Sequence, residues 1–169
     1  YEFHKVHGGL ATILTHPNNH PYDSGLVFAD EHNAVTLWTA KEDPRPEFYR
    51  NRVNAGIHIL SPELLDRSGI DPAAVGTVDP ETGKPVKVDL DRKLLKPLAG
   101  TGQLYCYDSP EYVKDMGTPE RYEQVQEDER QGRIQARNLS SPQKAVFLDR
   151  DGTINRYVGF LRHIDQMEL

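Results

Sequence analysis

Short apolar runs, separated by clusters of Pro, Gly, Asn and Asp, fill the first two thirds of the chain. Runs rich in β-branched and aromatic residues cover 10–15, 25–29, 34–39, 53–60 and 103–107. Apolar runs of this length between turn residues are typical of strands. The sequence therefore predicts a strand in each run, and it predicts a loop in HPNNHPYDS, between the first two runs.

Two predicted helix starts share one pattern, a hydroxyl residue followed by proline. Ser61 precedes Pro62, and Thr118 precedes Pro119. A hydroxyl side chain can cap the first N–H groups of a helix, and proline suits the first helical position because no donor is needed there. We expect the second helix to lie on the surface, because its residues are largely polar, and to end at Gly132.

The remaining segments divide the chain into two parts. Residues 71–89 are rich in Pro and Gly and predict an exposed excursion ahead of a short amphipathic helix at 94–98. NLSSPQ, at 138–143, has the composition of a linker, and AVFL, at 145–148, predicts a further strand. We therefore expect an α/β chain with a first domain at 1–139, a linker at 140–143 and the start of a second domain at 144–169.

Charge and composition narrow the classes of function. The 169 residues carry a formal net charge of -6, which gives no reason to expect binding to nucleic acid. The single Cys106 excludes a disulfide within the chain. No apolar stretch approaches the roughly 18 residues that would span a membrane. We expect a cytoplasmic protein without a membrane partner and, because the chain starts at Tyr1, a piece of a longer protein. Nothing in the composition indicates an oligomeric state.

Two aspartates follow the predicted strand of the C-terminal part. In FLDRDGTIN, Asp149 and Asp151 stand two residues apart. Side chains at this spacing on an extended chain point to one face, so the two carboxylates can converge. Mg²⁺ would relieve their repulsion, and Gly152 lets the backbone turn tightly enough for a phosphate to approach. The pattern predicts a magnesium site that binds a phosphate group. The ordinary alternative is a loop in which the two aspartates cap a turn.

This arrangement resembles the first motif of the haloacid dehalogenase superfamily of phosphatases. The resemblance implies that Asp149 is the nucleophile that takes the phosphoryl group, that Asp151 is the acid that protonates the leaving oxygen and later activates water, and that both bind Mg²⁺. QKAVFLDRDGTIN and YVGFL are similar to the branch that includes histidinol-phosphate and heptose bisphosphate phosphatases. The later motifs of the superfamily have no counterpart here, so only the first strand and loop of a Rossmann-like phosphatase domain are expected.

Three upstream segments resemble, in the same order, segments of sugar-1-phosphate nucleotidyltransferases: HPNNHPYDSGL, VNAGIHILSPELL and YVKDMGTPERY. The resemblance implies part of a three-layer, mostly parallel Rossmann-like sheet. It also implies that the surface around Asn54, Ala55 and Gly56 holds the sugar. Lys41 would then meet the sugar phosphate, and Asp115 would help to bind Mg²⁺.

The chemistry of nucleotidyl transfer needs residues of these types. A sugar phosphate that attacks the α-phosphate of a nucleoside triphosphate brings anions together, so a lysine and a metal cation must offset their repulsion. Taken singly, each residue has an ordinary alternative: Lys41 as a surface lysine, Asp115 as a turn residue and Asn54 as a hydrogen-bonding residue at a strand end. The glycine-rich phosphate loop of the family and its first metal-binding aspartate have no counterpart in this sequence.

The histidines are not expected to bind a metal. His16 and His20 have the spacing of a helical zinc pair, but Pro17 and the asparagines that follow exclude a helix there. His4, His7 and His58 are expected to be ordinary polar or core residues.

Together, the two resemblances imply a bifunctional enzyme of activated heptose synthesis, in which a heptose-type guanylyltransferase precedes a heptose bisphosphate phosphatase. Its substrates would be a sugar phosphate and a nucleoside triphosphate, and its cofactor would be Mg²⁺. Because neither site is complete in this sequence, we expect the chain alone to be inactive. Two alternatives stay open: a phosphatase whose upstream region only binds sugar phosphate, and a catalytically silent binding or assembly module. The residues do not show which sugar or which nucleotide base the enzyme uses.

Overall fold

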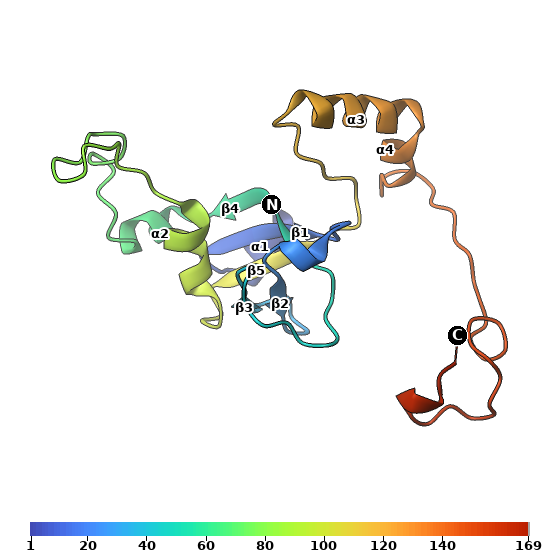
Figure 1. Ribbon diagram of the computed structural model, residues 1–169. Coiled ribbons are helices and arrows are strands. Elements are labelled where there is room, and N and C mark those ends of the chain that lie inside the picture. The colour runs from blue at the N-terminus through green and yellow to red at the C-terminus, as the bar shows by residue number, and fades with distance from the viewer. Residues whose placement is uncertain (169) are drawn as a thin grey trace.

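A single strand, β1 (Ala11–His16), lies at the centre of the sheet in the computed structural model, which describes residues 1–168 (Figure 1). It pairs antiparallel with β4 (Val53–Leu60) and parallel with β5 (Leu104–Asp108), in the order β4-β1-β5. A separate antiparallel hairpin consists of β2 (Val27–Ala29) and β3 (Val35–Trp38). All five strands predicted in the first 139 residues are confirmed, and so is the α/β class.

The prediction of a mostly parallel sheet is wrong for the described residues, because the sheet is mixed. The cause is the path of residues 17–52. This segment leaves β1 after His16 and returns to the same end of the sheet, where Val53 pairs with His16. Strand β4 must therefore run back along β1. Residues 61–103 then begin and end at the opposite end of the sheet, where Ala11 lies beside both Leu60 and Leu104. Strand β5 therefore runs parallel to β1.

Both predicted helix starts are confirmed, but only one hydroxyl residue caps its helix. In α3 (Pro119–Arg130) the hydroxyl of Thr118 accepts a hydrogen bond from the backbone N–H of Arg121. In α2 (Pro62–Arg67) the side chain of Ser61 makes no such bond. Its hydroxyl instead donates to the backbone oxygen of Gly9, so it joins the helix start to the entry of β1.

The other helical segments are short. The predicted helix at 94–98 forms as a π-helical turn, Asp91–Leu95, followed by a 3-10 turn, Lys96–Leu98. Gly132, with φ of 72°, separates α3 from α4 (Arg133–Ala136), which the sequence pattern did not indicate. A further helix, α1 (Glu2–His7), was not predicted either, and 3-10 turns lie at Pro21–Asp23 and Ile164–Gln166.

The core lies on one face of the sheet. Fully buried side chains of β1 and β5 pack there against Val35 of the hairpin and Leu95 of the π-helical turn. Those of the two strands are Ala11, Ile13, Leu104 and Cys106. Helix α1 lies on the other face. There the ring of Phe3 packs edge to face against the ring of Tyr107, with 5.3 Å between the ring centroids. Burial raises the pKa of the Cys106 thiol, so this cysteine is an inert core residue.

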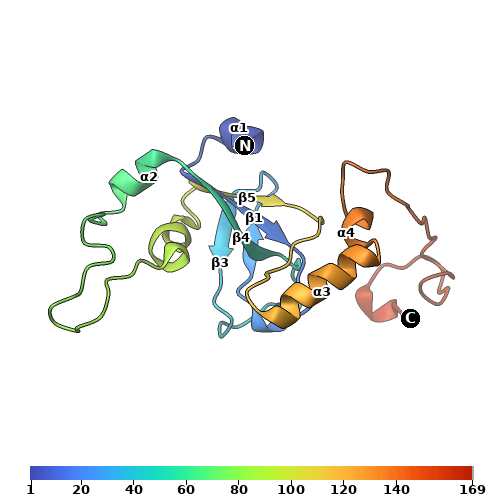
Figure 2. The ribbon, with the colours of Figure 1, turned by 90° about the horizontal axis from the view of Figure 1, so that it is seen from above.

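The predicted strand at 145–148 does not form. Phe147 is 94% exposed and Val146 is 81% exposed. Figures 1 and 2 both show the C-terminal segment beyond α3 and α4, away from the sheet. A strand needs a neighbour that accepts and donates its backbone hydrogen bonds, and the described part of the chain pairs none with these residues. Within residues 1–168, no helix has both the length and the apolar character needed to cross a membrane.

We expect amide hydrogen exchange to be much slower in β4 than at 144–160. The amides of β4 pair with the central strand, whereas those of 145–148 donate no hydrogen bond within the described chain. Exchange followed by mass spectrometry after proteolysis would measure both segments. Equal, strong protection in a monomer would contradict this view and would place the C-terminal segment in the same cooperative unit as the sheet.

Candidate functional site

Two cavities meet where β1 ends. The hairpin-side cavity, of about 460 Å³, lies between the end of β1, the β2–β3 hairpin and the π-helical turn. The α3-side cavity, of about 510 Å³, lies between the same strand end and residues 112–137. His16, Asn18 and Asn54 line both cavities, so the two are adjoining parts of one cleft.

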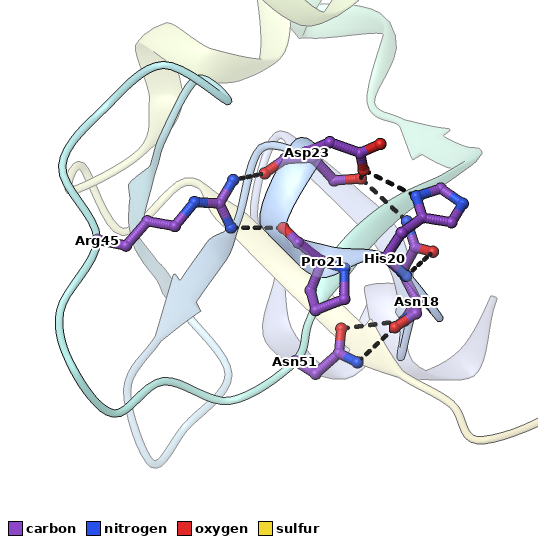
Figure 3. A network of polar contacts seen from close by, with 7 residues as sticks. Asn18, His20, Pro21, Asp23, Arg45 and Asn51 are labelled. Atoms are coloured by element: carbon purple, nitrogen blue, oxygen red, sulfur yellow. Dashed lines mark hydrogen bonds and ion pairs between the residues drawn. The ribbon is translucent and has the colours of Figure 1, made fainter.

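Residues 17–24 form a wall of this cleft and are held by a polar network (Figure 3). The carboxamide of Asn51 accepts from the backbone N–H of Asn18 at 3.0 Å and donates to its carbonyl at 2.7 Å. The guanidinium of Arg45 donates to the carbonyl oxygens of Pro21 and Ser24. These bonds satisfy backbone groups of a segment that has almost no regular structure, which fixes the wall.

The two histidines of the loop do not share a helix, as expected. His20 places Nδ1 2.8 Å from a carboxylate oxygen of Asp23, and this contact is the largest cause that lowers the pKa of Asp23. Burial lowers the pKa of His16. The histidines outside this loop also contact protein groups: His4 meets Thr12, His7 meets the Phe3 carbonyl and His58 meets Asn54.

A bulge in β4 follows Asn54, which lines both cavities, and contains Gly56, which lines neither. Ile13 pairs with His58, whereas Thr15 pairs with Asn54, so β4 carries extra residues at 55–57. Gly56 has a φ of 75°, which favours glycine. A Cβ on Gly56 would meet no atom within 4 Å. The backbone conformation therefore explains the glycine, and no close approach of another group requires it.

Lys41 and Asp115, the other residues predicted upstream, lie in different cavities. Lys41 lines the hairpin-side cavity together with Asn54, and its ammonium is 3.7 Å from the exposed carboxylate of Glu42. Asp115 lines the α3-side cavity, also with Asn54. The structure thus gathers Lys41, Asn54 and Asp115 around one cleft, with Asn54 on the wall that the two cavities share, whereas Gly56 lies outside both.

The downstream pair, Asp149 and Asp151, lines neither cavity. The chain bends at Arg150, so the argument that both side chains point to one face of a strand does not hold here. The guanidinium of Arg150 binds both carboxylate oxygens of Asp151 at 2.8 Å, and these hydrogen bonds are the largest cause that lowers the pKa of Asp151. Gly152 does take the tight turn expected of it, with φ of 84°.

These carboxylates do not form a metal site by themselves. In the described part of the chain no three His, Cys, Asp or Glu side chains are grouped so that they could hold an ion. Asp115 accepts from the backbone N–H of Gly117 at 2.7 Å and pairs with Arg121. Both oxygens of Asp151 are likewise engaged. The residues present therefore do not fit Mg²⁺ without exchanging their partners.

A buried charge network behind the cleft was not predicted. Asp108 accepts from Arg50 at 2.6 Å, from Thr15 at 3.1 Å and from Arg52 at 3.5 Å. The Arg52 side chain is 5% exposed, and its Nε has no acceptor among the described residues. The only signal in the sequence was the position of these charges at the ends of predicted strands, which did not show that they meet.

A second unpredicted contact attaches α3 to the α3-side cavity. The hydroxyl of Tyr112 donates to the buried carboxylate of Asp128 at 2.8 Å. Burial, and then this hydrogen bond, raise the pKa of Tyr112 to about 12, so the phenol stays protonated at neutral pH. The bond from Tyr112 is the largest cause that lowers the pKa of Asp128. The surface helix is thus fixed by polar contacts more than by an apolar face.

The chain is similar to curated enzymes that use sugar phosphates, while no family model matches it. It is 29% identical over 121 residues to the mannose-1-phosphate guanylyltransferase catalytic subunit beta of Dictyostelium discoideum, with 71% of this chain covered. It is 30% identical over 122 residues to a probable mannose-1-phosphate guanylyltransferase 2 of Oryza sativa subsp. japonica, and 31% identical over 121 residues to a mannose-1-phosphate guanyltransferase of Pichia angusta, each with 72% of this chain covered.

The aligned part spans 29% of the length of each of these relatives. The comparisons thus support the upstream resemblance to sugar-1-phosphate nucleotidyltransferases. They do not extend to heptose or to a phosphatase.

We expect Asp108→Asn to destabilise the fold by about 2 kcal/mol, because it leaves the buried guanidinium of Arg52 without a counter-charge. Glu63→Gln is the matched control, since it breaks the exposed pair with Arg67 and should cost less than about 0.5 kcal/mol. Urea unfolding of both variants measures the difference. Equal losses would mean that the buried network contributes no more than a surface ion pair.

Proposed function

We propose that residues 1–139 are the C-terminal part of a sugar-1-phosphate nucleotidyltransferase. The observation that carries this proposal is the shared position of Asn54, which lines one cavity with Lys41 and the adjoining cavity with Asp115. Similarity to mannose-1-phosphate guanylyltransferases supports the same class of reaction. The substrates proposed are a sugar 1-phosphate and a nucleoside triphosphate.

In this proposal the hairpin-side cavity binds the sugar phosphate. The pair between Lys41 and Glu42 is exposed on both sides, so a phosphate dianion can compete for the ammonium at little cost. Lys96 is less free, because its ammonium donates to the carbonyl of Thr39 at 3.3 Å and lies over the Trp38 ring. Lys41 would therefore offset the charge of the phosphate, and Asn54, which lines the same cavity, would contact the sugar ring.

We further propose that residues 144–169 begin a phosphatase domain of the haloacid dehalogenase type, joined through a linker at 140–143. Support comes from the run FLDRDGTIN and from the tight turn at Gly152. Asp149 as nucleophile and Asp151 as acid belong to this proposal. Activated heptose synthesis rests only on the order of the two parts, since the relatives are named for mannose 1-phosphate.

Mg²⁺ and a cytoplasmic location stay predictions for the full-length protein. Asp115 would have to release Arg121 before it could bind a cation, and no step of this proposal depends on the metal. The two alternatives, a phosphatase with a binding appendage and a silent assembly module, predict no nucleotidyl transfer by the full-length protein. That activity therefore separates them from the proposal.

We expect the chain to bind mannose 1-phosphate, with the largest NMR shift changes at Lys41 and Asn54. Lys41→Ala should weaken binding about tenfold, because a charge-assisted bond to phosphate is lost. Lys84→Ala removes the same charge outside both cavities and should leave the affinity unchanged. If the two variants lose affinity equally, binding reflects overall charge and the site is wrongly placed.

In the full-length protein, Asp115→Ala should abolish nucleotidyl transfer and leave phosphate release from a sugar bisphosphate nearly intact. Asp149→Ala should do the reverse, because the two residues belong to separate parts of the chain. Both activities would be measured on each purified variant, with circular dichroism as a control for folding. A single substitution that silences both activities in a folded protein would contradict the modular proposal.

A further inference from the structure

The hydrogen bonds of Asn54 fix the orientation of its carboxamide. Its Oδ1 lies 3.1 Å from the backbone N of Gly56, which can only donate. The same oxygen lies 3.2 Å from Nε2 of His58, so this imidazole nitrogen must carry a proton. Both lone pairs of Oδ1 are thus occupied. Asn54 can offer a ligand only N–H groups.

The amide nitrogen of Asn54 faces a carboxylate from a distant segment. Its Nδ2 lies 3.3 Å and 3.5 Å from the two oxygens of Asp91, which is the first residue of the π-helical turn. The Asp91 side chain is 41% exposed and lines the hairpin-side cavity beside Asn54. One N–H of Asn54 points to Asp91, and the second remains for a ligand.

His58 completes the arrangement from the far side of the bulge. Its side chain is 12% exposed, and Nε2 lies 3.9 Å from Oδ1 of Asp91. Its only hydrogen-bond partner in the described chain is Asn54. The imidazole therefore contacts both residues of the pair without being open to the cavity as they are.

We infer that Asn54 and Asp91 together bind one hydroxyl of the sugar phosphate, and that His58 is the positioning residue that holds them. A sugar hydroxyl both accepts and donates a hydrogen bond. The free N–H of Asn54 can donate a hydrogen bond to the hydroxyl oxygen. The carboxylate of Asp91 can accept a hydrogen bond from the hydroxyl O–H. This donor–acceptor pair selects a hydroxylated ring over a bare phosphate, and Lys41 supplies the phosphate contact. The inference rests on the proposed function and adds Asp91 and His58 to the site.

The first test measures binding to the 169-residue chain, labelled with ¹⁵N, with mannose 1-phosphate and inorganic phosphate as probes. We expect Asp91→Asn to weaken mannose 1-phosphate binding about 10- to 100-fold, the loss typical of a hydrogen bond to a charged group. Phosphate binding should not weaken, because the substitution removes a negative charge that repels the anion. Asp66→Asn, which removes an exposed charge on α2, should alter neither. Among monodeoxy analogues of the sugar, one should bind wild type weakly and lose little further affinity in Asp91→Asn.

The second test examines positioning without a ligand. The side-chain NH₂ resonances of Asn54 should shift in His58→Phe and return toward their wild-type positions in His58→Gln, whose amide can still donate. Affinity for mannose 1-phosphate should follow the same order. If His58→Phe fails to fold, a loss in His58→Gln that leaves the Asn54 resonances unmoved would already overturn the positioning role.

The two proposals fail in different ways. If mannose 1-phosphate moves no resonance at Lys41 or Asn54 in the wild-type chain, the proposed function is wrong and this inference falls with it. If the wild type binds and Asp91→Asn binds equally well, the proposed function stands and the inference is overturned. Equal weakening of mannose 1-phosphate and inorganic phosphate would also overturn it, because the loss would then come from a disturbed phosphate contact and not from a lost acceptor for a hydroxyl.

Discussion

The position of β1 between two partners of opposite direction determines where every other part of the site can lie. Because β4 is antiparallel and β5 is parallel to it, the end of β1, the start of β4 and the end of β5 meet at one edge of the sheet. Register places His16 opposite Val53 and Thr15 opposite Asp108 at that edge. The loops that follow, not the strands, therefore form the cleft, while the strands fix where those loops begin.

The polar groups at this edge serve two different purposes. At the end of β5, Asp108 pairs with the exposed Arg50 and the buried Arg52, and the net stabilisation from the buried pair is limited because removing charges from water is costly. In the cleft, Asn54 is held by hydrogen bonds to Gly56, His58 and Asp91 on an edge strand, where a bulge is tolerated. The charges of this network are therefore paired within the protein, whereas the hydrogen bonds of Asn54 lie at the cavity wall.

The local features of the fold could be predicted from the sequence, and the non-local ones could not. Apolar runs gave the strands, and hydroxyl–proline pairs marked both helix starts. Strand direction depends on where residues 17–52 return, which no local pattern encodes. The contact of Asn54 with Asp91 joins residues 37 positions apart, and that of Ser61 with Gly9 joins residues 52 apart. Helix α1 was missed because none of its residues is buried, so it has no apolar stripe to detect.

The C-terminal segment contains both a local feature that could be predicted and a non-local one that could not, within a few residues of each other. The turn after Arg150 forms because its bonds are local: the Arg150 carbonyl accepts from Ile154 at 2.9 Å, and Gly152 donates to Asn155 at 2.8 Å. The strand before it depends on cross-strand pairs, which contribute most of the stability that β-rich composition suggests. With no such pair inside residues 1–168, 145–148 remains without regular structure although its composition favours a strand. Its apolar side chains are exposed because no described strand lies beside them.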